Sequence, residues 1–166
     1  RTTMNGILGM SELLLQTQLS EKQHHFADTV YRSGAALLQI INDVLDFSKV
    51  EAGKLELERI RFDLPRAVDD VMDLFAESAK GKGLELVCTV AESVPTVLQG
   101  DPVRLRQILM NLVSNAVKFT ERGRVMLTVT MAEDSASHAI LRFEVQDTGI
   151  GIDQAVHSKI FDAFSQ

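Results

Sequence analysis

Residues 101–120 read DPVRLRQILMNLVSNAVKFT, and the fold is best inferred outward from this segment. Asp101 before Pro102 is typical of a helix start, because an aspartate accepts hydrogen bonds from the first free amides and proline fits the first helical turn. Apolar residues then recur at helical spacing, which predicts a helix over 102–119. The expected buried stripe consists of Leu105, Leu109, Leu112 and Ala116.

Polar residues with chemical potential follow a second stripe of this helix. Asn111, Asn115 and Lys118 stand at i, i+4 and i+7, on one side of the rod. Two asparagines one turn apart cost helix stability unless something uses their amides. Amide oxygens coordinate hard cations such as Mg2+, and lysine neutralises phosphate. The alternative is a solvated helix face with ordinary amides.

Two strands are predicted downstream of this helix, over 125–131 and 141–146, joined by a loop over 133–137. Directly after them stands the sequence Asp147-Thr148-Gly149-Ile150-Gly151. Glycines permit close backbone approach to a ligand, and a carboxylate accepts a hydrogen bond from an exocyclic amine. An ordinary turn is the alternative, since the segment fits neither a Walker A loop nor a dinucleotide-binding fingerprint.

A further helix and strand are predicted upstream of residue 101. The helix runs over 64–80, from Asp63 to Gly81, and the strand over 84–90. Strands with one polar face favour an antiparallel sheet with helices on its other face. Cys88 falls on the inward side of its strand, so we interpret it as an apolar core residue rather than a nucleophile.

Residues 1 to about 54 have helical periodicity throughout. Ser20 with Gln23 forms a capping-box signature, which starts a second helix after a break. Its apolar seam, as we name it, steps by four and three residues through Phe26, Val30, Ser33, Leu37, Ile40, Val44 and Phe47. We favour a hairpin that dimerises into a four-helix bundle; a hairpin packed on the rest of the chain is the alternative.

Composition excludes several classes of protein. Seventeen Lys and Arg stand against 23 Asp and Glu, so a net charge of -6 gives no reason to expect nucleic acid as a partner. The single cysteine forms no internal disulfide. Apolar runs are far shorter than the ~20 residues that cross a bilayer. Because the chain opens on Arg1 rather than Met, we expect it to be a piece of a longer protein.

Five segments in this order together resemble sensor histidine kinases, most closely the hybrid type. RTTMNGILGM (1–10) resembles the run after the phosphoacceptor histidine, and IINDVLDFSKVEAGKLELE (40–58) the entry to the ATP-binding domain. Residues 101–120 match the family's N box, DTGIGI (147–152) its first glycine box and IFDAFSQ (160–166) its F box. The resemblance covers nearly the whole chain.

The resemblance implies an α+β chain with two domains. Residues 1–54 would form the dimerisation and histidine-phosphotransfer hairpin, an antiparallel pair of helices that dimerises into a four-helix bundle. Residues 55–166 would form a GHKL (Bergerat-type) α/β sandwich with a mixed sheet, ending before the ATP lid. The expected phosphoacceptor histidine precedes Arg1 by three residues, so we expect this chain alone to be inactive.

The resemblance also assigns site residues. Asn115 would bind Mg2+ with Asn111 beside it, and Lys118 would contact phosphate. Phe119 would pack near the adenine base of ATP, and Asp147 would recognise its amino group. Three further sets of residues have implied roles: Gly149 and Gly151 in shaping the pocket, Phe161 and Phe164 in anchoring the loop to the lid, and Thr2 in orienting water for dephosphorylation of the response regulator. An exposed residue at a fraying helix end is the alternative for Thr2.

The implied function is ATP-dependent autophosphorylation of a histidine, followed by phosphotransfer to a receiver-domain aspartate. The implied partners are a second copy of the chain and a response-regulator receiver domain, in the cytoplasm, with membrane attachment only through regions outside this chain. A catalytically silent kinase-like module that dimerises and regulates another kinase is the alternative. A GHKL ATPase acting on DNA is disfavoured by the acidic charge and the helical hairpin.

Overall fold

The computed structural model describes residues 2–135 and 138–154. The chain divides into two compact units, Arg1–Glu56 and Leu57–Gln166. In the described part of the chain, no helix is both long and apolar enough to span a membrane.

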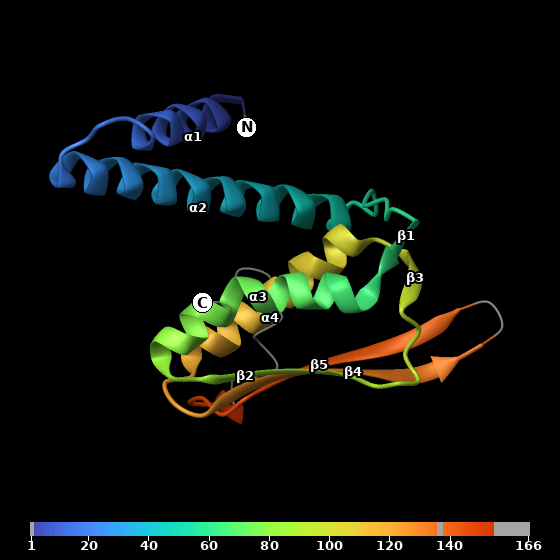
Figure 1. The fold of residues 1–166 in the computed structure, drawn as a ribbon. Helices are drawn as coiled ribbons and strands as arrows, with labels where there is room; N and C mark the ends of the chain where they lie inside the picture. The colour runs from blue at the N-terminus through green and yellow to red at the C-terminus, as the bar shows by residue number, and fades with distance from the viewer. Residues whose placement is uncertain (1, 136–137, 155–166) are drawn as a thin grey trace. The chain divides into compact units, whose positions relative to one another are not determined.

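The first unit is a pair of helices, α1 (Thr2–Leu15) and α2 (Glu21–Glu51) (Figure 1). The predicted capping box is present: the Gln23 amide donates to the Ser20 hydroxyl, and the Gln23 side chain accepts from the Ser20 amide. The helices approach closely at Gly34, where an added Cβ would lie 3.1 Å from a methyl group of Leu8. The N-terminal helical region expected from the sequence is confirmed.

The apolar seam of α2 is not covered by α1. Leu37 is 48% exposed and Ile40 59%, whereas the buried residues of α2 are Ala27 and Gly34 on a neighbouring stripe. The hairpin therefore buries one stripe of α2 and leaves a broader apolar surface open. Two helices alone do not hide this surface.

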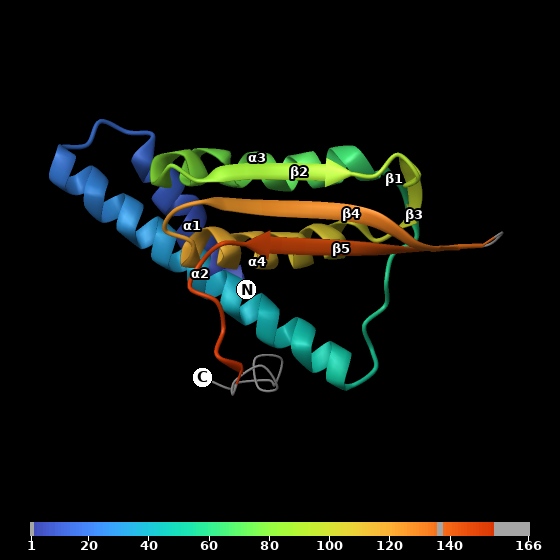
Figure 2. The ribbon, with the colours of Figure 1, turned by 90° about the horizontal axis from the view of Figure 1, so that it is seen from below.

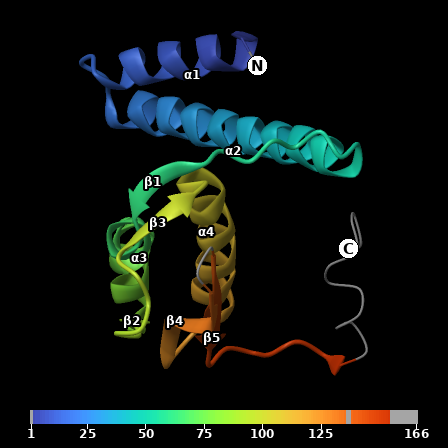
Figure 3. The same cartoon turned by 90° about the vertical axis from the view of Figure 1, so that its right-hand side faces the viewer.

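The second unit is a two-layer α/β structure. Helices α3 (Leu64–Lys82) and α4 (Pro102–Phe119) lie side by side on one face of a sheet made of β2 (Glu85–Val90), β4 (Arg124–Asp134) and β5 (Ala139–Asp147) (Figures 1 and 3). The core between the layers holds Leu64, Val68 and Val71 of α3 and Leu109 and Val113 of α4, with Val125, Leu127 and Val129 of β4.

The sheet is mixed, in the order β2-β4-β5 (Figure 2). Strands β4 and β5 form the expected antiparallel hairpin, but β2 pairs with β4 in parallel, from Glu85 opposite Arg124 to Val90 opposite Val129. The antiparallel arrangement favoured from the exposed polar faces is therefore wrong for β2. A crossover through α4 separates β2 from β4, and such a connection delivers the second strand in parallel.

Two short strands were missed by the sequence analysis. Strands β1 (Ile60–Asp63) and β3 (Val97–Gly100) form an antiparallel pair, with Ile60 opposite Gly100. Each leads directly into a helix, β1 into α3 and β3 into α4. Four residues are too few to show a period, so the sequence alone did not reveal them.

Three local predictions differ from the structure. Helix α3 continues past Gly81 to Lys82, because the residue that caps it in the left-handed conformation, with a φ of 69°, is Gly83 and not Gly81. Leu112 is 40% exposed, and Val113 takes its place in the buried stripe of α4. Strand β4 continues through Glu133 and Asp134, which were expected in a loop, after a bulge following Met131.

Candidate functional site

The N-terminal end of α4 is fixed by Asp101. Its Oδ1 accepts hydrogen bonds from the amides of Val103 (3.1 Å) and Arg104 (3.0 Å), as predicted for the helix start. Its Oδ2 accepts from the Glu58 amide at 3.2 Å, which ties the segment before β1 to the same helix end. The hydrogen bond from the Arg104 amide, more than those from Glu58 and Val103, lowers the pKa of Asp101.

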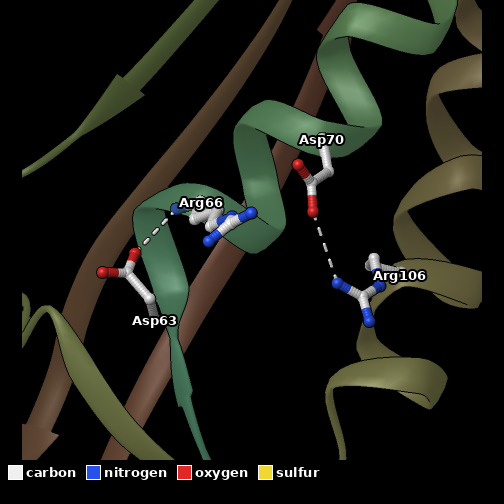
Figure 4. Close-up of polar contacts among 4 residues, drawn as sticks. All are labelled: Asp63, Arg66, Asp70 and Arg106. Carbon is white, nitrogen blue, oxygen red and sulfur yellow. Dashed lines mark hydrogen bonds and ion pairs between the residues drawn. The ribbon is translucent and has the colours of Figure 1, made fainter.

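Helices α3 and α4 are linked on their outer side by an ion pair. Arg106 Nη1, on α4, lies 3.5 Å from Asp70 Oδ2, on α3 (Figure 4). The same view shows the start of α3, where the Asp63 carboxylate accepts a hydrogen bond from the Arg66 amide at 2.8 Å. Both partners of the ion pair are substantially exposed, so it is worth under about 1 kcal/mol. Packing, more than this pair, holds the two helices together.

The polar stripe of α4 is exposed along its whole length. Asn115 Nδ2 lies 3.4 Å from Asn111 Oδ1, a hydrogen bond that uses the nitrogen of Asn115 as donor and leaves its oxygen to accept or coordinate. The ammonium of Lys118 lies 5.0 Å from the centre of the Phe119 ring. The stripe thus offers an amide oxygen and a cation on one helix face, the donor set for Mg2+ and phosphate.

The loop after β5 packs against the C-terminal end of this stripe. The Gly149 amide donates to Asp147 Oδ1 at 2.8 Å, and the Ile150 amide donates to the Phe119 carbonyl at 3.4 Å. A Cβ added to Gly149 would lie 2.5 Å from the Phe119 carbonyl oxygen and 2.9 Å from Asp147 Oδ1. Only glycine permits this approach, so the carboxylate of Asp147 is held near the end of α4.

Thr148 contributes a contact that the sequence analysis missed. Its hydroxyl accepts from the Arg124 amide at 3.0 Å and lies within hydrogen-bond distance of the carbonyls of Arg122 and Arg124. The turn at Gly123, with a φ of 109°, leaves no room for a side chain beside this hydroxyl. Thr148 therefore attaches the loop after β5 to the start of β4. Its position between Asp147 and Gly149 is the signal that sequence reasoning passed over.

Lys82 is a second residue that the sequence analysis missed. Its ammonium, at the end of α3, donates to the carbonyls of Val117 (2.8 Å), Lys118 (3.0 Å) and Thr120 (3.4 Å) at the end of α4. The lysine is 36 residues away in sequence from Lys118, so no local pattern could have indicated the contact.

The other predicted site residues are Gly151, Thr2, Phe161 and Phe164. Gly151 has a φ of 69° and no atom within 4 Å of an added Cβ, so it turns the chain without a close contact. Thr2 is an exposed residue at the start of α1, in the other unit. Phe161 and Phe164 lie outside the described residues.

Two family descriptions match the chain in the order of the two units. The His Kinase A (phospho-acceptor) domain matches residues 1–53. The histidine kinase-, DNA gyrase B- and HSP90-like ATPase family matches residues 100–166, which include α4 and the loop after β5. The chain belongs to the sensor histidine kinases. This confirms the family and the fold class expected from the sequence motifs.

Curated histidine kinases align with the chain over its whole length. The sensor protein GacS of Pseudomonas syringae pv. syringae is 47% identical over 166 residues, and the signal transduction histidine-protein kinase BarA of Escherichia coli K12 is 46% identical. The alignment covers 100% of this chain and 18% of each of these relatives. The chain thus spans about a fifth of the length of these relatives.

Solved histidine kinases share the fold. The full-length ShkA structure, described as a complex with AMPPNP, matches with a TM-score of 0.79 and 39% identity, over 100% of this chain and 35% of ShkA. The Acinetobacter baumannii histidine kinase AdeS matches with a TM-score of 0.62 at 21% identity and supports the fold alone.

Proposed function

We propose that this segment is the core of a sensor histidine kinase that binds ATP with Mg2+ in its second unit and phosphorylates a histidine. The observation that carries the proposal is the close contact of Gly149 with the Phe119 carbonyl. It places the carboxylate of Asp147 next to the helix end that carries Lys118 and, one turn earlier, Asn115. The AMPPNP named in the ShkA complex, at 39% identity, supports the same ligand class.

Each side chain of the proposed nucleotide site has one role. Asn115, with Asn111 beside it, would hold Mg2+ through amide oxygens. Lys118 neutralises phosphate charge, and Phe119 packs near the base. Asp147 accepts a hydrogen bond from the adenine amino group, in a pocket shaped by Gly149 and Gly151. Bound Mg2+ would supply charge neutralisation on the phosphates.

The proposed reaction moves one phosphoryl group twice. An imidazole nitrogen of a histidine N-terminal to Arg1 attacks the γ-phosphorus, the bond to the bridging oxygen breaks, and ADP leaves with the electron pair. A receiver-domain aspartate then takes the phosphoryl group from the histidine. Because little covalent chemistry falls to the ATP-binding unit, positioning and charge neutralisation are its contribution. Thr2 is proposed to orient water for a separate activity, the hydrolytic dephosphorylation of the response regulator.

The proposed assembly is a homodimer through residues 1–54, followed by the catalytic domain over 55–166. The exposed apolar seam of α2 supports the dimer, since a second hairpin would cover the stripe that α1 leaves open. We place the kinase segment in the cytoplasm, with membrane attachment only outside this segment. Its proposed signalling partner is the receiver domain of a response regulator.

The direct test of function is phosphorylation of the full-length protein. Incubation with γ-labelled ATP and Mg2+ should give a phosphoprotein that is labile in acid and stable in base, as phosphohistidine is. A protein that binds ATP and takes up no label would support the alternative, a silent kinase-like module that regulates another kinase. A protein that binds no ATP would refute the proposed function.

Two substitutions test the assigned site. Asn115→Ala should abolish Mg2+-dependent ATP binding, whereas the neighbouring exposed Ser114→Ala should leave it unchanged. Asp147→Asn removes a charge-assisted hydrogen bond and should cost roughly 1.5–3 kcal/mol of ATP affinity. Glu144→Gln makes the same charge change on the exposed face of β5 and serves as its control. If Asn115→Ala binds ATP as well as Ser114→Ala does, Asn115 does not belong to the site. The same holds for Asp147 if Asp147→Asn binds ATP as well as Glu144→Gln does.

A further inference from the structure

Lys82 closes the C-terminal end of a helix to which it does not belong. Its ammonium donates to the carbonyls of Val117, Lys118 and Thr120, at 2.8, 3.0 and 3.4 Å. The last carbonyls of a helix have no partner within the helix, and an ammonium carries three donors. The positive charge also complements the negative end of the helix dipole. One side chain of α3 therefore satisfies two carbonyls in the last turn of α4 and that of the following residue, Thr120.

The carbonyls that Lys82 binds lie on both sides of Phe119. The Phe119 carbonyl is left to point elsewhere, and it accepts from the Ile150 amide at 3.4 Å. The same oxygen is the atom that Gly149 approaches too closely for any side chain. Fixing the two flanking peptides fixes the direction of the one between them, because consecutive peptide planes share their α-carbons.

The residues that follow Lys82 bind the segment between α4 and β4 as well. The Glu85 amide, at the start of β2, donates to the Gly123 carbonyl at 2.9 Å. Residues 82–85 therefore hold the chain from the end of α4 to the start of β4. The loop after β5 is attached to this same stretch through Thr148. Among these contacts, that of the Lys82 side chain reaches the last turn of α4.

We propose that Lys82 is a positioning residue for the nucleotide site. By holding the peptides around Phe119, it directs the Phe119 carbonyl toward Gly149 and Ile150. The carboxylate of Asp147 is thereby kept close to the end of α4 that carries Lys118 and Asn115. This inference rests on the proposed ATP-binding function. Lys82 acts through the backbone, because its ammonium is bound to helix carbonyls.

Two substitutions of Lys82 separate its hydrogen bonds from its bulk. Methionine has a similar length without donors, and arginine keeps both charge and donors. Lys82→Met should weaken ATP binding in the presence of Mg2+ by about five- to tenfold in the full-length protein, and Lys82→Arg should restore most of it. Lys80→Met is the matched control, since Lys80 lies on the exposed side of the same last turn of α3.

The readouts distinguish positioning from general destabilisation. Binding is measured well below the melting temperature of each variant, and autophosphorylation should show a raised KM for ATP with a smaller change in kcat. Exchange of the Ile150 amide, which donates to Phe119, should accelerate in Lys82→Met and not in Lys80→Met.

The positioning role of Lys82 and the proposed ATP-binding function are refuted by different results. Loss of affinity in Lys80→Met equal to that in Lys82→Met, or wild-type affinity in Lys82→Met, would overturn the positioning role. No ATP binding by the wild-type protein would instead overturn the proposed function.

Discussion

Replacement of Gly149 by alanine tests the contact on which the site depends. An added Cβ would lie 2.5 Å from the Phe119 carbonyl oxygen and 3.0 Å from its carbon. Both atoms belong to the backbone at the end of α4, so no flexible side chain can move aside. To reach ordinary contact at 3.4 Å, the loop and the helix end must separate by about 0.9 Å.

The energetic cost follows from this overlap. Inserting a methyl group into a packed contact costs about 1–3 kcal/mol, and the smaller entropy of the unfolded alanine chain returns about 0.4–1 kcal/mol. Separation also stretches the Ile150–Phe119 hydrogen bond, which at 3.4 Å is already long. We expect a net loss of stability of about 1–2 kcal/mol. If Asp147 moves with the loop, ATP affinity should fall about tenfold, which is 1.4 kcal/mol.

The assay combines thermal unfolding with ATP titration of the full-length protein in Mg2+. Gly81→Ala is the control, because Gly81 lies within α3 and an added Cβ meets no atom within 4 Å. That variant should be stabilised by about 0.5–1 kcal/mol and should bind ATP normally. A Gly149→Ala protein with wild-type melting and wild-type affinity would refute the close approach.

Three further outcomes are expected. Leu37→Asp places a charge in the apolar seam and should convert the dimer to monomer by light scattering, whereas Ala35→Asp, off the seam, should not; a dimeric Leu37→Asp protein would put the interface elsewhere. The hydrogen bond from the Arg104 amide is the main reason that the pKa of Asp101 is lowered, so the ionised carboxylate stabilises the fold above about pH 4 and this stabilisation is lost as the pH falls further. Asp101→Asn should therefore flatten the fall of the melting temperature on the acid side. An unchanged slope would contradict this. The buried Thr120 hydroxyl has no hydrogen-bond partner in the described part of the chain, so Thr120→Val should be neutral or stabilising by up to about 1 kcal/mol, and marked destabilisation in urea unfolding would show that the hydroxyl is used.

Local chemistry made several elements predictable. The bounds of α4 followed from Asp101, Pro102 and the helical spacing, and the capping box at Ser20 followed from two residues three apart. Such features depend on hydrogen bonds between neighbours in sequence, which residue types alone indicate. The polar stripe with Asn111 and Asn115 was visible for the same reason.

The sequence did not decide between two nearby residues that both fit the same local pattern. Gly81 and Gly83 are both plausible helix ends, and Leu112 and Val113 both fit a helical stripe. In each pair the structure selects the second residue, because the direction of the following strand and the position of the sheet decide which one is placed correctly.

What the sequence by itself determined was the identity of the helices and long strands, the family and the polar groups on one face of α4. Tertiary structure alone decided the parallel pairing of β2 with β4, the contact of Gly149 with Phe119 and the reach of Lys82 across to α4. The physical reason is range. Periodicity and capping report hydrogen bonds over three or four residues, whereas these contacts join residues about thirty or more apart, which only packing of the layers brings together.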